Sequence, residues 1–197
     1  MIATITIALF AKESFITKGV KEVKVVKDGH TYVIKREVPT IPKQYQNTLR
    51  GKIAPMKVAE GIETVGELEV INYIKEAEKS EDIILVDART EDWYESIHIP
   101  TALNVPFMLF KDRENAIETL NLEFNVEKKK DGTLDFSKAK TVVVYCNGAW
   151  CLQSIQLIRD AKYSLLNLGY PKEKIKYYRG GMQSWVTFGL TTIGKGK

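Results

Sequence analysis

Cys146 and Cys151 are the residues whose type and position most directly suggest nucleophilic chemistry in this chain. Cys146 follows the β-branched run Thr141-Val142-Val143-Val144-Tyr145 and precedes an uncharged loop. Such a run predicts a buried strand, and in parallel sheets functional sites gather beyond the carboxyl ends of the strands. We therefore expect the Cys146 sulfur to be presented to solvent, with backbone amides of the loop and of the next helix directed at it.

Backbone amides around a sulfur atom favour its thiolate form. An ordinary thiol with a pKa of ~8.5 is ~3% ionised at pH 7, and lowering the pKa by ~2 units raises this fraction roughly 25-fold. The lower basicity weakens the nucleophile and removes roughly eightfold of that gain. The larger expected benefit of such amides is the stabilisation of an anionic sulfur intermediate. A buried cysteine that only packs at a strand end is the alternative interpretation of Cys146.

The elements that position Cys146 belong to a strand–helix alternation that starts near residue 62. Short apolar runs predict buried strands at 83–86 and 141–145, and a last strand is expected at 174–178. Helices are expected after a capping box formed by Thr64-Val65-Gly66-Glu67, near 114–122, from 151 to 168, and around Trp185. This order predicts an α/β fold in which helices cover both faces of a parallel central sheet.

The first part of the chain lacks this alternation. Residues 1–11 are uncharged and mostly apolar, which favours an export signal and a periplasmic or otherwise exported protein, although the basic start of such signals is missing. A buried or disordered N-terminal strand and a cytoplasmic protein are the alternatives. Alternating residues around Asp28-Gly29 predict a β-hairpin within 22–36. Residues 37–61, punctuated by proline and glycine, are interpreted as a surface linker.

Length, composition and charge exclude several classes of protein. The 197 residues, 44% hydrophobic and 27% charged, suit one globular domain (62–193) with an N-terminal extension (12–61) and a possible signal segment (1–11). No apolar run reaches the ~20 residues of a membrane-spanning helix. Residues 61–197 hold 18 Lys/Arg and 20 Asp/Glu, which excludes a basic nucleic-acid platform. Two cysteines cannot form a disulfide scaffold, and His30 and His98 do not complete a zinc site.

Three stretches of the chain follow one another in a characteristic order. The first is Ile84-Leu85-Val86-Asp87-Ala88-Arg89, followed by His98-Ile99-Pro100-Thr101-Ala102-Leu103-Asn104-Val105-Pro106. The second is the strand that ends at Cys146, with the helix that runs to Leu168-Gly169-Tyr170. The third is Tyr178-Arg179-Gly180-Gly181-Met182-Gln183-Ser184-Trp185. Together, over roughly residues 62–193, they resemble the signatures of rhodanese-like domains, a family of single-domain sulfurtransferases.

The resemblance implies a sulfurtransferase whose cysteine becomes a persulfide. By motif position Cys146 is the nucleophile, and the persulfide is held by the loop Asn147, Gly148, Ala149, Trp150 and Cys151. The implied donor is thiosulfate or a polysulfide, and the implied acceptor is a thiol, cyanide or a carrier protein. No metal or cofactor is implied beyond the covalent persulfide. Asp87 and Arg89 are expected to support the site without reacting, and His98 is expected to be a hydrogen-bonded turn residue rather than a base.

The loop departs from the family pattern. Members that use thiosulfate well often place Arg or Lys in this loop to neutralise a dianion, whereas 146–151 carries no charge. In addition, Thr101 replaces the usual glycine of H-I-P-G, and Gly148 comes one place early. These departures favour a donor less charged than thiosulfate, or a protein partner. Trp150 is either a contact for that donor or partner, or a packing residue.

Cys151 leaves several functions open. It can attack a persulfide on Cys146 and release sulfide, protect the thiolate as a disulfide, or simply pack at the start of a helix. A disulfide requires the two Cα atoms to lie within about 7 Å. The enzyme is the principal hypothesis, and the alternatives are a catalytically weak binding or sensor module and a thiol redox protein that uses both cysteines. A phosphatase is disfavoured because 147–154 holds no arginine to clamp a phosphate.

Overall fold

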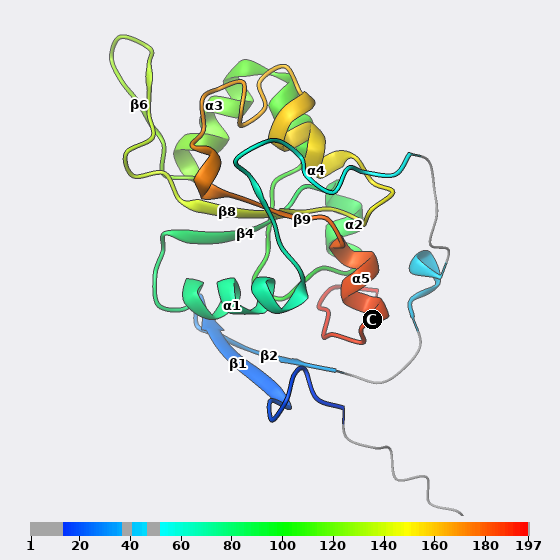
Figure 1. The fold of residues 1–197 in the computed structure, drawn as a ribbon. Coiled ribbons are helices and arrows are strands. Elements are labelled where there is room, and N and C mark those ends of the chain that lie inside the picture. Colours follow the sequence, from blue (N-terminus) through cyan, green and yellow to red (C-terminus); the bar gives the residue numbers. More distant parts are fainter. Residues whose placement is uncertain (1–13, 37–40, 47–51, 197) are drawn as a thin grey trace, which may run out of the picture.

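The fold is organised around a five-stranded sheet with the strand order β3-β9-β8-β4-β5 (Figure 1). The computed structural model describes residues 14–36, 41–46 and 52–196. All neighbouring strands of this sheet are parallel, which confirms the predicted α/β class. The strands are β3 (Glu63–Thr64), β4 (Ile83–Asp87), β5 (Leu103–Asn104), β8 (Thr141–Tyr145) and β9 (Ile175–Tyr178).

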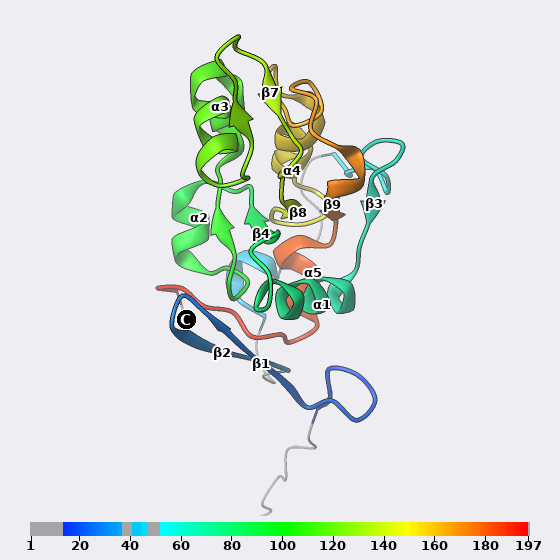
Figure 2. The same cartoon turned by 90° about the vertical axis from the view of Figure 1, so that its left-hand side faces the viewer.

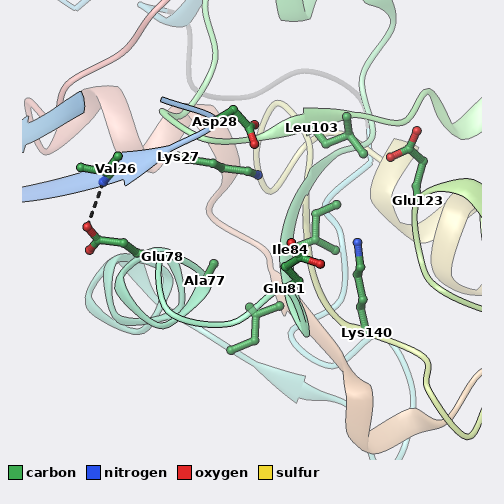
Figure 3. A pocket seen from close by; sticks show the side chains of 11 residues that line it. Val26, Lys27, Asp28, Ala77, Glu78, Glu81, Ile84, Leu103, Glu123 and Lys140 are labelled. Carbon is green, nitrogen blue, oxygen red and sulfur yellow. Dashed lines mark hydrogen bonds between the residues drawn. The ribbon is translucent and has the colours of Figure 1, made fainter. Parts of the chain in front are cut away.

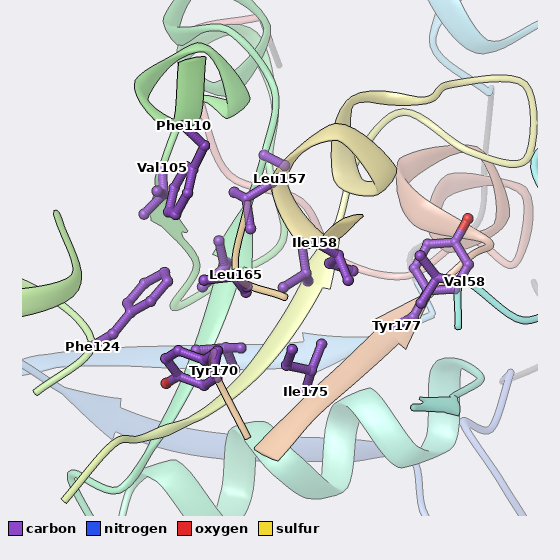
Figure 4. Close-up of a cluster of buried hydrophobic side chains, with 14 of the residues drawn as sticks. Val58, Val105, Phe110, Phe124, Leu157, Ile158, Leu165, Tyr170, Ile175 and Tyr177 are labelled. Carbon is purple, nitrogen blue, oxygen red and sulfur yellow. The ribbon is translucent and has the colours of Figure 1, made fainter. Parts of the chain in front are cut away.

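Helices cover both faces of the sheet, as the alternation predicts (Figure 1). On one face lie α1 (Glu67–Ala77) and α5 (Gly181–Thr187), and on the other lie α3 (Arg113–Leu122) and α4 (Gln153–Ile155). Successive residues of a strand point to opposite faces, so β4 and β8 contribute to two cores. The α3–α4 core, part of which is drawn in Figure 4, takes Ile84, Val86, Val142 and Val144, and the α1–α5 core takes Leu85, Val143 and Tyr145.

Shorter elements connect these layers. They are α2 (Glu91–Ser96), the antiparallel pair β6 (Glu127–Lys128) and β7 (Leu134–Asp135), and 3-10 turns at Lys43–Tyr45, Phe107–Lys111 and Lys172–Lys174. Within the described ranges, no helix combines the length and the apolar character needed to cross a membrane.

The predicted N-terminal hairpin is present and packs against the domain. β1 (Glu22–Lys27) pairs antiparallel with β2 (His30–Lys35). The turn residues Asp28 and Gly29 have φ of 49° and 74°, as a type I′ turn requires. The hairpin lies beside α1 (Figure 2), and Val25 and Ile34 are buried in the α1–α5 core.

The segment interpreted as a surface linker is buried at several positions. In its described parts, 41–46 and 52–61, Tyr45 is fully buried, and Ala54 and Val58 are each 1% exposed. Tyr45 enters the α1–α5 core, whereas Ala54 and Val58 enter the α3–α4 core. Removing these apolar side chains from water favours a segment that covers the domain over one that runs along its surface. The predicted signal segment, 1–11, lies outside the described residues.

The capping box predicted at 64–67 is wrong. Thr64 belongs to β3, and its hydroxyl donates to the Met56 carbonyl rather than accepting from a helix amide. The first helix begins at Glu67, and the Glu69 carboxylate accepts a hydrogen bond from the Gly66 amide at 3.0 Å. Because β3 pairs with β9, the backbone at Thr64 is extended, and the N-cap of α1 is Gly66 instead.

The long helix predicted at 151–168 is wrong beyond its first turns. α4 continues as a π-helical turn over Gln156–Asp160 and then stops. The Leu157 carbonyl accepts a hydrogen bond from the Leu165 amide at 3.0 Å. In a continuing helix that carbonyl would accept from the fourth residue along. A loop therefore competes successfully for the helix acceptors, although the apolar residues of this stretch still enter the α3–α4 core.

Candidate active site

The predicted site residues meet at the carboxyl ends of two neighbouring strands. β4 and β8 pair in parallel with Asp87 opposite Tyr145. The chain therefore delivers Asp87, Arg89 and Cys146 to one edge of the sheet, which is where parallel topology places functional sites. The loop 147–151 follows Cys146 and leads into α4.

The Cys146 sulfur contacts both hydrogen-bond donors and an acceptor. It lies 3.2 Å from the Ser154 hydroxyl oxygen, and its thiol donates to the Cys151 carbonyl at 3.3 Å. The backbone amides of Gly148 and Ser154 also hydrogen-bond to the sulfur. The expected amide donors are thus represented by one from the loop and one from α4.

The expectation that Cys146 is presented to solvent is wrong for this conformation. Cys146 is only 2% exposed. The loop folds back through a hydrogen bond from the Cys151 amide to the Gly148 carbonyl, at 2.9 Å. Across the loop, the Ala54 amide of the N-terminal extension donates to the Ala149 carbonyl at 2.6 Å. The extension is thus bonded to the loop that follows the buried sulfur.

The thiols of the two cysteines differ in pKa. Burial raises the pKa of the Cys146 thiol, but hydrogen bonds from Cys151, from the Ser154 hydroxyl and from the amides of Ser154 and Gly148 outweigh burial and lower it to about 7. The pKa of Cys151 is raised, first by its hydrogen bond to Cys146 and then by burial. Cys146 is therefore the sulfur that ionises near neutral pH, and Cys151 keeps its proton.

We expect the thiolate absorbance of Cys146, measured against Cys146→Ser in the ultraviolet, to rise with a midpoint near pH 7 because the thiol has a pKa of about 7. In Cys151→Ala the midpoint should move upwards, since the variant loses the hydrogen bond from Cys151 that favours the thiolate. This readout needs no reagent to reach the buried sulfur. An unchanged midpoint in Cys151→Ala would show that the second thiol does not tune the first.

A buried ion pair connects β4 to the loop. Asp87 and Arg89 are fully buried, with 2.6 Å between Arg89 Nη2 and the Asp87 carboxylate, and Arg89 Nη2 also donates to the Ile97 carbonyl at 2.6 Å. The Asp87 charge raises the pKa of Arg89 despite the opposing effect of burial. Arg89 Nη1 donates to the Tyr45 hydroxyl at 2.9 Å and lies 3.4 Å from the Asn147 side-chain oxygen. These contacts support the loop without placing Arg89 at the sulfur.

Sequence patterns did not identify Tyr45 and Ser154 as site residues. The Tyr45 hydroxyl donates to the Asn147 side-chain oxygen at 2.8 Å, and the Tyr45 carbonyl accepts from Gln183 at 2.8 Å. Tyr45 comes from a stretch without periodicity, so no local pattern predicts its place. Ser154 had a usable signal, because a hydroxyl in the first helical turn after a nucleophile loop can face the nucleophile.

The remaining loop residues have structural contacts. Asn147 is 3% exposed, and its carbonyl accepts from the Gln183 amide at 2.8 Å. Trp150 is half-buried and packs against the α1–α5 core, which supports the packing interpretation of this residue.

Gly181 allows α5 to approach the backbone of the nucleophile. It has φ of +53°, and a Cβ added to it would lie 2.3 Å from the Cys146 carbonyl oxygen. That carbonyl accepts from the Met182 amide at 3.0 Å. Only glycine fits this close contact between α5 and the end of β8.

Gly181→Ala is therefore expected to lower the free energy of unfolding by more than the ~1–2 kcal/mol that a left-handed backbone alone costs. Gly132→Ala is the matched control, because Gly132 has φ of +86° and no atom within 4 Å of its added Cβ. Denaturant-induced unfolding of both variants measures the difference. Equal losses would contradict the close approach of α5 to Cys146.

His98 and Thr101 belong to the turn before β5. His98 Nδ1 donates to the Tyr94 carbonyl at 2.7 Å, and its ring stacks on Tyr94 with centroids 3.8 Å apart. Burial lowers the pKa of His98. These contacts agree with a turn histidine rather than a base. Thr101 has φ of 71°, a conformation that explains why glycine is usual at this motif position.

A pocket of ≈ 470 Å³ lies at the other end of β4 (Figure 3). It is lined by Ile83 and Ile84 at the amino end of that strand, and by side chains of both charges, such as Lys27, Lys140 and Glu78. None of the predicted site residues lines it. This pocket is therefore separate from the site around Cys146.

The chain matches one protein-family model, and its similarity to individual known proteins is weak. A family model described as a rhodanese-like domain matches residues 70–187. An HTH-type transcriptional regulator of Mycobacterium tuberculosis is 25% identical over 109 residues, which cover 55% of this chain and 37% of that protein. The present chain thus spans little more than a third of that relative's length.

Two solved structures illustrate the structural likeness. The BH2092 protein of Bacillus halodurans has a TM-score of 0.47 and 25% identity, over 68% of this chain and 78% of that chain. A thiosulfate sulfurtransferase of Pseudomonas aeruginosa has a TM-score of 0.44 and 20% identity, over 68% of this chain and 20% of that chain.

The family match includes the elements that build the site. Residues 70–187 contain Asp87 and Arg89 at the end of β4, Cys146 with its loop, and the Gly181 contact of α5. This range covers more than half of the 197 residues. The chain therefore belongs to the rhodanese-like domain family.

Proposed function

We propose that the protein is a sulfurtransferase that carries sulfane sulfur as a persulfide on Cys146. The observation that carries the proposal is a thiol with a pKa of about 7 that directly follows a central strand and receives hydrogen bonds from two backbone amides. A thiolate is the reactive form of cysteine, and this environment supplies it at neutral pH. Membership of the rhodanese-like family supports the same chemistry.

The reaction divides into two sulfur transfers. In the first, the Cys146 thiolate attacks the sulfane sulfur of the donor, the sulfur–sulfur bond of the donor breaks, and the remainder leaves as an anion. In the second, a thiol or cyanide attacks the terminal sulfur and restores the Cys146 thiolate. The Gly148 and Ser154 amides are suited to stabilise the anionic persulfide between these steps. The proposal includes no cofactor beyond the covalent persulfide.

The charges around the loop favour a donor with little negative charge. The loop itself is uncharged, and the positive charge of Arg89 is paired with Asp87 in the interior. Arg179 contributes one cation beside the loop, where its Nε donates to the Ala54 carbonyl at 3.0 Å. One cation offers weaker compensation to the two charges of thiosulfate than to the single charge of a persulfide group. We therefore propose a persulfide, carried by a small thiol or by a protein, as the preferred donor.

A donor can reach Cys146 only when its cover opens. The cover consists of the folded-back loop and the extension, joined by the hydrogen bond between the Ala54 amide and the Ala149 carbonyl. Sulfur loading therefore requires the loop to separate from the extension near Ala54. Such loop movements are common steps in enzyme turnover.

Sulfur transfer to cyanide, detected as thiocyanate, tests the proposal. With full-length protein, a small-thiol persulfide should support faster thiocyanate formation than thiosulfate at equal concentration. The same mixtures without protein give the uncatalysed rate. Failure of every sulfane donor to support transfer above that rate would reject the enzyme.

The enclosure of Cys146 favours a second candidate, a rhodanese-like binding or sensor module. A sulfur that is 2% exposed has little direct access to small donors. This candidate predicts a stable complex with a protein partner that persists in Cys146→Ala. A complex that depends on the cysteine, together with sulfur uptake, would instead support transfer to a protein acceptor.

We also propose that the protein is exported, on the basis of the uncharged segment 1–11 alone. Cell fractionation with sequencing of the mature amino terminus tests this proposal. The expected result is periplasmic protein that begins at Lys12, and full-length protein confined to the cytosol would contradict it.

A further inference from the structure

Cys151 is placed to react with a sulfur carried by Cys146. The loop folds back so that the Cys146 thiol donates to the Cys151 carbonyl at 3.3 Å, and the Cys146 side chain is the first cause of the raised pKa of Cys151. Both cysteines are free thiols. The folded loop thus brings Cys151 close to Cys146, which their spacing in the sequence did not establish.

The Cys151 side chain is held in this position. Its amide closes the turn by donating to the Gly148 carbonyl at 2.9 Å, and its sulfur lies 3.4 Å from the Gln153 side-chain oxygen. Cys151 is 6% exposed, so it is enclosed together with Cys146. A nucleophile held beside its target reacts as part of the same molecule, which gives it a large advantage over a thiol in solution.

The protonation states of the two cysteines also fit a reaction in which Cys146 takes up sulfur first and Cys151 reacts second. Cys146 has the lowered pKa and is the sulfur that takes up sulfane sulfur first. Cys151 has the raised pKa and keeps its proton. That proton is available for a sulfur atom that departs from Cys146.

We propose that Cys151 resolves the Cys146 persulfide and releases hydrosulfide, an inference that rests on the proposed sulfurtransferase function. The Cys151 sulfur attacks Sγ of Cys146, the bond from Sγ to the terminal sulfur breaks, and a Cys146–Cys151 disulfide forms. The Cys151 proton leaves with the terminal sulfur as HS⁻. The two cysteine sulfurs supply the two electrons that reduce sulfane sulfur to sulfide. A dithiol reductant then returns the disulfide to two thiols before the next cycle.

The test mixes the reduced full-length protein with one equivalent of polysulfide in the absence of other thiols. Intact mass and released sulfide are followed in time. The wild type should gain one sulfur transiently and then become two hydrogens lighter than the reduced protein, while about one sulfide per chain is released beyond the amount that sulfur loading itself produces. Cys151→Ser should keep the added sulfur at least about tenfold longer and release only the sulfide that loading itself produces, about one sulfide per chain less than the wild type. Cys151→Ala provides a second replacement without a hydroxyl.

The possible failures are distinguishable. A persulfide that lives as long in the wild type as in Cys151→Ser overturns the resolving role but leaves the sulfurtransferase intact, because sulfur has been loaded. Absence of sulfur uptake in both proteins rejects the sulfurtransferase and the resolving role with it. Cys146→Ser is the control and should neither gain sulfur nor release sulfide. Sulfide release by that variant overturns the assigned order of the two cysteines.

Discussion

Cys146→Ser is expected to reduce sulfur transfer at least about a thousandfold, because the chemistry passes through this single atom. A serine hydroxyl is not ionised near neutral pH and cannot carry a persulfide. The replacement is close to isosteric, and a hydroxyl at 146 can keep the contacts with Ser154 and the Cys151 carbonyl. The fold should therefore persist. Thiocyanate formation measures the activity, and thermal unfolding verifies the fold.

Ser154→Ala is the informative comparison for Cys146→Ser. It keeps the nucleophile but removes a hydrogen bond that lowers the pKa of Cys146. Transfer should fall by roughly tenfold, the effect of about one hydrogen bond to a charged group, and the pKa of Cys146 should rise.

Retention of more than a tenth of the wild-type activity by a well-folded Cys146→Ser would contradict covalent transfer through this residue.

Asp87→Ala is expected to lower the free energy of unfolding by about 3–5 kcal/mol, because it leaves Arg89 charged and unpaired in the interior. Both side chains of the pair are 0% exposed, so water cannot compensate for the lost carboxylate. The loss is a large fraction of the ~5–15 kcal/mol stability typical of a domain. Denaturant-induced unfolding measures it, and Asp87→Asn, which keeps an acceptor, should lose less.

Glu95→Ala is the control for the buried pair. It breaks the ion pair between Glu95 and Lys195. The Glu95 side chain is 46% exposed and the Lys195 side chain is 78% exposed. Solvent-exposed pairs of this kind contribute less than about 1 kcal/mol. Similar losses for Asp87→Ala and Glu95→Ala would contradict the view that the ion pair of β4 is a buried structural element.

The framework of the site follows from local sequence patterns. The apolar runs at 83–86 and 141–145 predict buried strands because a strand covered on both faces needs apolar side chains throughout. Parallel pairing then brings Asp87 and Cys146 to one edge, as the structure shows. The hairpin turn at Asp28-Gly29 follows equally directly, since both residues tolerate a positive φ.

The enclosure of the site depends on contacts that no local pattern records. Tyr45 meets Asn147, and Ala54 meets Ala149, across about a hundred residues of chain. The early end of α4 has a nearer cause, because the Leu165 amide, eight residues along the chain, donates to the Leu157 carbonyl. Helical periodicity in 151–168 reports burial of the apolar residues correctly, but it does not report which backbone groups are still free to continue a helix.

The most direct test is to locate isotope-labelled sulfur on Cys146. Cys151→Ser, in which the neighbouring thiol cannot consume a persulfide, is mixed with polysulfide that carries the label, digested, and analysed by mass spectrometry. We expect one labelled sulfur on the peptide that contains Cys146, and its removal by cyanide as labelled thiocyanate. A Cys146 that remains an unmodified thiol with every sulfane donor would contradict the account.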